Sequence, residues 1–300
     1  MAGSTHPYTV LDVFTDTPLT GNPLAVFTAG ELIPSRLMQA VARELHLSET
    51  VFLLPGDGEA DATVRIFTPQ SELPFAGHPV LGAAFVVGAE HELERVRLRT
   101  GAGIVPVTLM REHGAIVFGE MEQPLPSVCA FDRAGELLSA LGVDGSLLPV
   151  EAYTNGPTHV MVGVADVSGL GVLEPDLAAI AKLGPLGIDC FAACDPGVGS
   201  PAPGAGSPAD VPARVRCRVF CPGLGVPEDP ATGSAAGPLA LHLARHGRYS
   251  PGGALEIIQG AEIGRPSRLV ARVEGPPDSP ARITVGGSAV VVAEGWLRAG

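Results

Sequence analysis

The alternation of apolar and polar residues predicts a chain built mainly of strands, with a few helices between them. In the N-terminal part, strand patterns cover residues 8–14, 24–29, 50–55 and 62–69. Apolar residues recur at helical spacing over 33–47 and 80–90, and Pro34 suits a first helical turn. Alternation returns over residues 95–121 and predicts several more strands.

The C-terminal part of the chain shows the same mixture of patterns. Helical spacing covers residues 133–142, 174–184 and 235–247. Strand patterns cover residues 158–165, 213–220, 254–260, 267–275 and 281–300. Residues 123–132 are interpreted as a connection, and the stretch rich in Pro, Gly, Ala and Ser at 195–212 predicts an exposed flexible loop.

One pattern occurs twice in the chain. Residues 65–69 (RIFTP) match 218–222 (RVFCP), and residues 74–78 (PFAGH) match 230–234 (PATGS) after a gap that is three residues longer. Each copy combines a strand, a loop, a glycine and the start of a helix. Two matches in the same order predict an internal duplication and hence two similar α+β domains. If a pseudo-two-fold axis relates them, their matched loops face a shared cleft, which is a favoured place for a small molecule.

Composition narrows the classes of protein that this pattern allows. The net charge of −13 argues against non-specific nucleic-acid binding, which depends on Lys and Arg. The N-terminus shows no signal-peptide pattern, and no run of eighteen apolar residues predicts a membrane span. Five cysteines without C-x-x-C spacing predict buried free thiols in a reducing, cytoplasmic compartment. We expect no metal, because neither HExxH nor a Cys/His cluster with ligand spacing is apparent.

The two matched loops are candidate anion sites. The first turn of a helix has unpaired N–H groups and partial positive charge, and a glycine just before it allows close approach. Gly77-His78 and Gly233-Ser234 therefore suit the two sides of a small carboxylic acid. The alternative for Ser234 is an ordinary N-cap. Pro238 is expected early in this helix, where the missing N–H costs least.

Four residues are candidates for acid–base chemistry. His78 has a side chain whose pKa suits proton transfer near neutrality, although a purely structural histidine is the alternative. Glu228 and Asp229 precede the second helix and can orient an imidazole or an amine, or else belong to a solvated turn. Glu49 precedes an apolar strand, which would raise its pKa and suit a general base that becomes an acid. A solvated turn glutamate is the alternative.

Two common enzyme classes lack their motifs. The sequence contains no Walker loop, and no GxGxxG motif follows a predicted strand. A nucleotide cofactor therefore has no support, and we expect no cofactor. Ser234, His78 and Asp229 offer the residue types of a hydrolase triad. However, TGSAAG is not G-x-S-x-G, so a serine hydrolase is disfavoured.

The chain resembles the phenazine-biosynthesis isomerase-like (PhzF-like) family nearly end to end. The resemblance rests on DVFTDTPLTGNPLAVF, LSETVFL, RIFTPQSELPFAGHPVLGAA and RVFCPGLGVPEDPATGSAAGPLALHL, in this order. It implies a fold similar to diaminopimelate epimerase, with each domain a mixed β-sheet or barrel wrapped around a central helix. It also implies domains at 1–124 with 287–300, and at 125–286, and a homodimer.

The resemblance further implies cofactor-free isomerisation of trans-2,3-dihydro-3-hydroxyanthranilate. In the family a glutamate removes the proton from C3 and a proton is delivered to C1, and that glutamate falls on Glu49. The family's histidine, aspartate and serine fall on His78, Asp229 and Ser234. For substrate binding we expect the backbone of Gly77 and Gly233, together with Thr232 and the asparagine of the turn Gly21-Asn22-Pro23.

Two alternatives stay open beside this isomerase. One is an epimerase or tautomerase that acts on another secondary metabolite, and the other is a scaffold that binds a small acid without catalysis. A racemase with two thiols is disfavoured, because His78 and Ser234 occupy the matched positions and Cys221 lies twelve to thirteen residues before the second.

Overall fold

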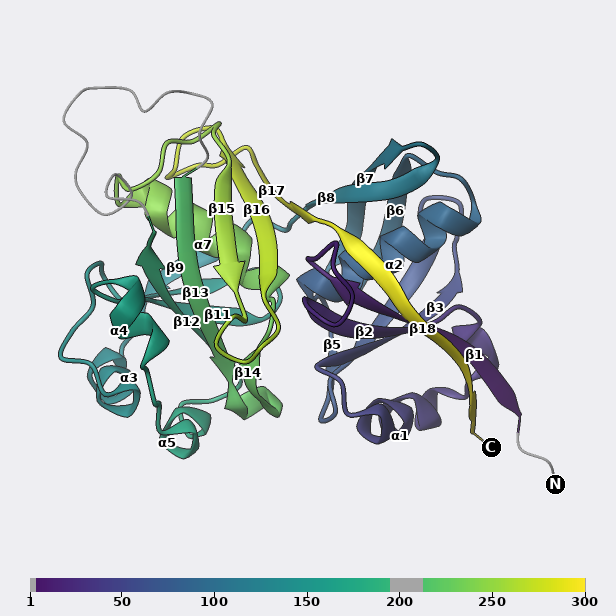
Figure 1. The fold of residues 1–300 in the computed structure, drawn as a ribbon, viewed down its shortest axis with the longest axis horizontal. Helices are drawn as coiled ribbons and strands as arrows, with labels where there is room; N and C mark the ends of the chain where they lie inside the picture. Colours follow the sequence, from purple (N-terminus) through teal and green to yellow (C-terminus); the bar gives the residue numbers. More distant parts are fainter. Residues whose placement is uncertain (1–3, 195–212, 300) are drawn as a thin grey trace. The chain divides into compact units, whose positions relative to one another are not determined.

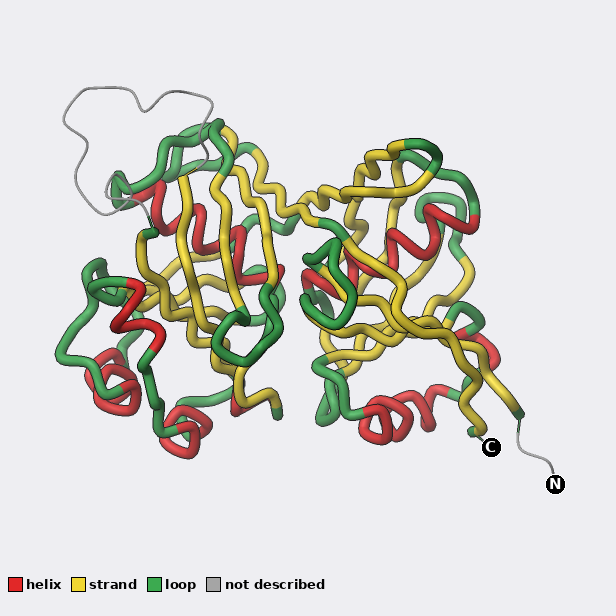
Figure 2. Tube along the Cα trace, in the orientation of Figure 1, coloured by secondary structure: helices red, strands yellow, loops and turns green. Residues whose placement is uncertain are grey.

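A computed structural model describes residues 4–194 and 213–299, so the loop expected at 195–212 lies outside the described residues. The described part is a mixed α/β fold that has a large mixed sheet and few helices (Figures 1 and 2). The chain divides into two compact units. The first unit consists of Met1–Glu122 with Gly286–Gly300, and the second unit is Gln123–Val285.

The first unit contains eight consecutive strands and the last strand of the chain. Its strands are β1 (Thr5–Val13), β2 (Asn22–Phe27), β3 (Glu49–Pro55), β4 (Ala62–Phe67), β5 (Glu72–Leu73), β6 (Arg95–Thr100), β7 (Gly103–Glu112), β8 (Ala115–Glu122) and β18 (Ala289–Arg298). Its helices are the short η1 (Gly30–Leu32), α1 (Ser35–Leu45) and α2 (Gly77–Glu90).

The second unit contains the remaining elements. Its strands are β9 (Ser127–Ala130), β10 (Glu151–Thr154), β11 (Thr158–Gly163), β12 (Leu186–Ala193), β13 (Ala213–Cys221), β14 (Val226–Asp229), β15 (Leu255–Gln259), β16 (Ser267–Glu274) and β17 (Arg282–Gly287), the last of which crosses the unit boundary. Its helices are α3 (Ala134–Leu141), α4 (Val167–Gly171), α5 (Leu177–Ala181), η2 (Pro222–Leu224) and α7 (Gly233–Arg245).

The two units pair their strands in the same order. In the first unit the order is β18-β1-β2-β3-β4-β6-β7-β8, where only β2/β3 and β4/β6 are parallel. In the second unit it is β9-β10-β11-β12-β13-β15-β16, where only β11/β12 and β13/β15 are parallel. Parallel neighbours need a crossover connection. Helices supply it each time: α1 and α2 in the first unit, and α4 with α5 and then α7 in the second.

Each unit contains one helix that is buried on nearly all sides. Helix α2 contacts β1, β2, β3, β4, β6, β7 and β8, and α7 contacts β11, β12 and β16. Helices that are apolar all round are typical of such a central position. Glycine makes the close packing possible, since a Cβ at Gly82 would lie 2.5 Å from Leu24 Cδ2.

The sheet register defines counterpart positions in the two units. Thr50 pairs with Phe67 in the first unit, and Ile188 pairs with Phe220 in the second. Because the two phenylalanines hold the same place in the repeated motif, the residues before Thr50 and Ile188 are also counterparts. These residues are Glu49 and Gly187.

The neighbouring strand extends this correspondence. Leu24 of β2 pairs with Glu49, and His159 of β11 pairs with Gly187. Leu24 and His159 are therefore counterparts. The first unit thus has a carboxylate on β3 beside a leucine on β2, whereas the second has a glycine on β12 beside an imidazole on β11.

The sequence patterns differ from the structure in several places. The connection expected at 123–132 contains strand β9, which pairs with β10. Strand β12, formed by Leu186–Ala193, had no prediction, and the helix expected at 174–184 is limited to Leu177–Ala181. All of these elements depend on partners that are distant in sequence, which local patterns do not reveal.

The prediction of buried free thiols is confirmed for three of the five cysteines. All five cysteines are free of disulfides. Cys190, Cys217 and Cys221 are buried, but Cys129 and Cys194 are exposed. None of the described helices is long and apolar enough to span a membrane.

Candidate active site

Helix α2 begins without a side-chain cap. Its N-cap is Ala76, and Gly77, His78 and Pro79 form the first turn. Proline is well tolerated here because first-turn N–H groups have no partner within the helix. The partial positive charge of the helix start is therefore not offset by a capping side chain.

His78 contacts two polar side chains of the first unit. Asn22 Nδ2 lies 3.2 Å from His78 Nδ1, and His78 Nε2 lies 3.3 Å from Glu49 Oε2. An amide nitrogen only donates, so Nδ1 accepts this hydrogen bond. A neutral ring then has its hydrogen on Nε2, which faces the Glu49 carboxylate.

Burial decides the charge of this imidazole. Only 3% of the His78 side chain is exposed, and burial lowers the pKa of His78 to about 3. The ring is therefore neutral near pH 7, even though a carboxylate lies beside it. Glu49 is the first residue of β3 and is 14% exposed, so the interpretation of Glu49 as a solvated turn residue is wrong.

Helix α7 begins in the same way, with different chemistry. Its N-cap is Thr232, again without a side-chain capping bond, and Ser234 is the second helical residue. The N-cap interpretation of Ser234 is therefore wrong. Its hydroxyl instead lies 3.0 Å from Nε2 of His159, and both residues are buried.

A glutamine fixes the loop that leads into α7. Gln259 Nε2 donates to the carbonyl of Asp229 at 2.7 Å and to Oγ1 of Thr232 at 2.9 Å. Its Oε1 accepts from the N–H of Thr232 at 2.9 Å. Thr232 Oγ1 in turn donates to Asp229 Oδ2 at 2.6 Å. Asp229 is buried, so this carboxylate is held in place and does not belong to a solvated turn.

Glu228 has a different role from the one expected for it. Its carboxylate accepts from Nε and Nη2 of Arg218 at 2.9 and 2.8 Å. The same pair exists in the first unit, where Arg65 donates to Glu72 at 2.7 and 2.8 Å. Glu228 is therefore part of a repeated structural ion pair, and the expectation that it orients an imidazole or an amine is not supported.

Two side chains bind carbonyls at the start of α7. Pro238 is the sixth helical residue, beyond the expected first turn, so the carbonyl of Ser234 loses its partner within the helix. Asn155 Nδ2 donates to this carbonyl at 3.0 Å. Gln123 Nε2 donates to the carbonyl of Gly233 at 2.7 Å. These contacts fix the backbone of the candidate anion site.

The structure brings the predicted residues together in two groups. Asn22, Glu49, Gly77 and His78 lie at the start of α2, and Asp229, Thr232, Gly233 and Ser234 lie at the start of α7. A shared cleft between the groups stays a prediction, as does each residue's role.

Sequence reasoning missed His159. One signal was present in the sequence, since His159 is the only ionisable residue in the strand pattern THVMVGV. The contact with Ser234 is formed over 75 residues of sequence.

A second cluster of polar groups lies in the second unit. Glu151 Oε2 lies 3.1 Å from His242 Nδ1 and 3.0 Å from His246 Nε2, and the three residues offer possible metal ligands. Sequence reasoning overlooked this pair of histidines, of which His242 lies in α7 and His246 is the C-cap residue that follows it. Arg245 Nη1 and the Tyr153 hydroxyl donate to the same oxygen, each at 2.9 Å. A guanidinium thus already balances the carboxylate, and the cluster is explained as an ion-pair network.

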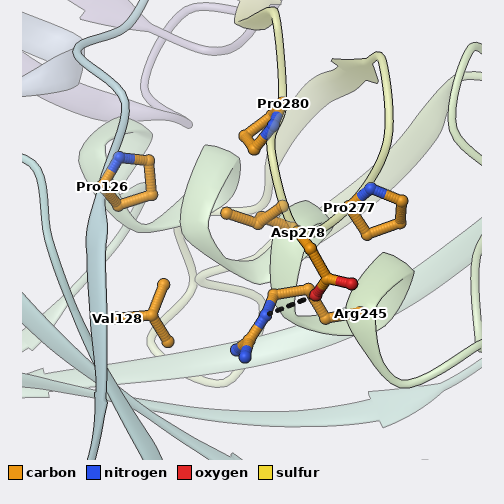
Figure 3. A pocket seen from close by; sticks show the side chains of 7 residues that line it. Pro126, Val128, Arg245, Pro277, Asp278 and Pro280 are labelled. Atoms are coloured by element: carbon orange, nitrogen blue, oxygen red, sulfur yellow. Dashed lines mark ion pairs between the residues drawn. The ribbon is translucent and has the colours of Figure 1, made fainter.

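A small pocket near this cluster lies apart from both groups of candidate residues. It has a volume of about 270 Å³ and is lined by three prolines, Val128, Leu241, Arg245 and Asp278 (Figure 3). Arg245 Nε and Asp278 Oδ1 face each other there at 3.9 Å. None of the candidate residues lines this pocket, so it adds nothing to the candidate active site.

Comparison with known proteins identifies the family of this chain. The sequence model of the phenazine biosynthesis-like proteins matches residues 11–295. The trans-2,3-dihydro-3-hydroxyanthranilate isomerase of Pseudomonas aeruginosa is 47% identical over 290 residues, which cover 97% of this chain and 98% of that enzyme. The chain belongs to the phenazine biosynthesis-like family.

Solved structures agree on the fold. A PhzF-family phenazine biosynthesis protein of Bacillus anthracis superposes with a TM-score of 0.80 at 24% identity, covering 98% of this chain and 99% of that one. A hydroxyproline epimerase from Agrobacterium vitis superposes with a TM-score of 0.63 at 15% identity, covering 99% and 92%. The fold is therefore similar to both PhzF-family and epimerase structures.

Proposed function

We propose that the protein is a trans-2,3-dihydro-3-hydroxyanthranilate isomerase that uses Glu49 as its general acid and base. The proposal is supported by 47% identity to a relative with that name over nearly the whole of both chains. The observation that carries it is the Glu49 carboxylate 3.3 Å from the buried, neutral His78. A carboxylate in this position can take a proton from a substrate carbon and later return it.

The proposed reaction moves one proton and needs no redox partner. The Glu49 carboxylate takes the proton from C3 as that C–H bond breaks, and the protonated Glu49 gives this proton to C1 as a new C–H bond forms. His78 Nε2 lies 3.3 Å from Glu49 Oε2, so the neutral ring is placed to orient the carboxylate before it accepts the proton. The chain contributes every group in this scheme.

The second unit is proposed to bind the substrate's polar groups. The first-turn N–H groups of α7 at Gly233 and Ser234 suit a carboxylate, because no side chain caps them. Asp229 is held by Thr232 and suits an amine. The matching strand orders of the two units support an origin by duplication. A pseudo-two-fold relation between the units remains part of this proposal.

Replacement of Glu49 by glutamine tests the assignment. The amide keeps the shape but accepts no proton, so we expect turnover to fall by about 10² to 10⁴-fold. Glu72→Gln is the matched control, because Glu72 is a half-exposed ion-pair partner in the same unit. A folded Glu49→Gln enzyme with unchanged turnover would exclude Glu49 as the acid and base.

A second candidate function is epimerisation, which the fold shared with a hydroxyproline epimerase favours. Turnover in deuterated water separates the two reactions. An isomerase places deuterium on a carbon that had no exchanging hydrogen, whereas an epimerase labels and inverts a single carbon. Binding of the acid without any exchange would support the non-catalytic scaffold instead.

Two further expectations concern assembly, which follows from the resemblance, and location, which follows from the cysteine content. The resemblance implies a homodimer, and analytical ultracentrifugation of the purified protein tests this directly. A cytoplasmic location is tested by fractionation of the cells that produce it.

A further inference from the structure

The second unit contains a pair of side chains at the place where the first unit has Glu49 and His78. Ser234 is the counterpart of His78, and its Oγ lies 3.0 Å from His159 Nε2. The counterpart of Glu49 is Gly187, and a methyl group on Gly187 would overlap His159 Nδ1. The missing side chain at position 187 therefore makes room for the imidazole.

The surroundings of His159 determine which nitrogen has the hydrogen. Burial lowers the pKa of His159 to about 4, so the ring is neutral near pH 7. Among the described residues, Nδ1 has no hydrogen-bond partner. A buried N–H without a partner is rarer than a buried acceptor without one. The hydrogen therefore belongs on Nε2, which donates it to Ser234 Oγ.

This arrangement sets the direction of the serine hydroxyl. When Oγ accepts from His159, the hydroxyl hydrogen of Ser234 is left to donate elsewhere. Its oxygen is on the second residue of α7, beside the first-turn N–H groups. The hydroxyl thus adds a donor to the same anion site.

We propose that His159 is a positioning residue that makes Ser234 a hydrogen-bond donor toward a carboxylate or another acceptor of the substrate. This inference rests on the proposed function, because it assigns Ser234 to substrate binding. In the first unit the carboxylate of Glu49 acts on the substrate itself, with His78 beside it. In the second unit, His159 acts through Ser234 and touches no substrate.

Kinetics test the consequence for the reaction. His159→Leu introduces the residue found at the counterpart position 24, and His159→Gln retains a donor. Loss of a whole donor typically costs about 10² to 10³-fold in kcat. Loss of its positioning is expected to cost roughly 10 to 100-fold in kcat/KM in the leucine variant, and the glutamine variant should recover most of it. Met161→Leu, two residues along the same strand, is the control for core disturbance.

A double substitution separates positioning from a structural role. His159→Leu should cost nothing further in kcat/KM once Ser234→Ala has removed the hydroxyl. Losses that multiply in the double variant overturn the proposal.

The ring tautomer gives a test that does not need turnover. In ¹⁵N-labelled protein at pH 7, NMR should show the His159 hydrogen on Nε2, and Ser234→Ala should change that signal. A hydrogen on Nδ1 overturns the proposal whether or not the enzyme is active. If the wild type fails to convert trans-2,3-dihydro-3-hydroxyanthranilate, the proposed function fails, and the NMR result still decides the direction of the Ser234 hydroxyl.

Discussion

The starts of α2 and α7 share one backbone plan and differ in the side chains behind it. At α2 a neutral imidazole faces a carboxylate, and at α7 a hydroxyl faces a neutral imidazole. The group behind the helix comes from β3 in the first unit, as Glu49, and from β11 in the second, as His159. The comparison shows that a repeated fold keeps its helix starts while the polar groups change both type and strand.

The repeated Arg–Glu pair shows the opposite behaviour, because its chemistry is retained while its burial changes. Arg65 and Glu72 are 27% and 43% exposed, whereas Arg218 and Glu228 are 9% and 11% exposed. Each guanidinium also lies about 5 Å from the centre of a phenylalanine ring two residues later, at 5.1 and 5.0 Å. The same contacts should therefore differ in their contribution to stability.

Replacement of the two arginines by alanine is expected to give the largest difference between the units. Arg218→Ala leaves a buried carboxylate without its partner and frees the carbonyls of Leu170 and Leu173, so the free energy of unfolding should fall by about 3–5 kcal/mol. Arg65→Ala removes a more exposed pair and should cost about 1 kcal/mol or less. Urea unfolding of both variants measures the difference, and equal losses would contradict it.

A buried carboxyl group in the second unit should cause the next difference in stability between the two units. Asp189 of β12 is the counterpart of Val51, since they pair with Val219 and Ile66. Burial raises the pKa of Asp189 to about 8. The folded protein then binds one more proton than the unfolded chain between about pH 4 and pH 8. Stability should therefore fall as pH rises through this window, by on the order of 1 kcal/mol per pH unit.

Asp189→Asn removes this titration. We expect the variant to be stabilised relative to the wild type at pH 8, and less so or not at all at pH 5. Thermal unfolding at both pH values measures the change. The same pH dependence in the variant and in the wild type would assign it to other groups.

The sequence predicted part of this picture for physical reasons. The RIFTP and RVFCP copies and the glycines before each helix are local signals, and they led to both helix starts and to the family resemblance, which the comparisons confirm. Mixed strand-and-helix composition is also confirmed. The roles of Glu49 and Ser234 stay predictions.

The remaining features of the candidate site depend on contacts between residues that are far apart in the sequence, and local patterns do not indicate such contacts. His159 lies opposite Gly187 only through the pairing of β11 with β12. Ser234 had the N-cap as its alternative because the helical pattern covered 235–247, whereas the helix begins two residues earlier, at Gly233. Strand pairing and helix boundaries are set by tertiary packing, so these assignments needed the structure.

The smallest expected effect concerns the backbone of the two helices. The sixth residue is Gly82 in α2 and Pro238 in α7, so only α7 leaves the carbonyl of its second residue without an N–H partner. Asn155 compensates for this at Ser234. Asn155→Ala should therefore lower the free energy of unfolding by about 1–3 kcal/mol, the typical cost of an unsatisfied buried polar group.

A second substitution identifies the cause of that loss. Pro238→Ala restores an N–H that can donate to the carbonyl of Ser234 within the helix. Asn155→Ala should then cost clearly less in the Pro238→Ala background than in the wild type, as chemical denaturation would show. If the cost is the same in both backgrounds, Asn155 stabilises the second unit through other contacts, and the difference between the two helix starts does not arise from the proline.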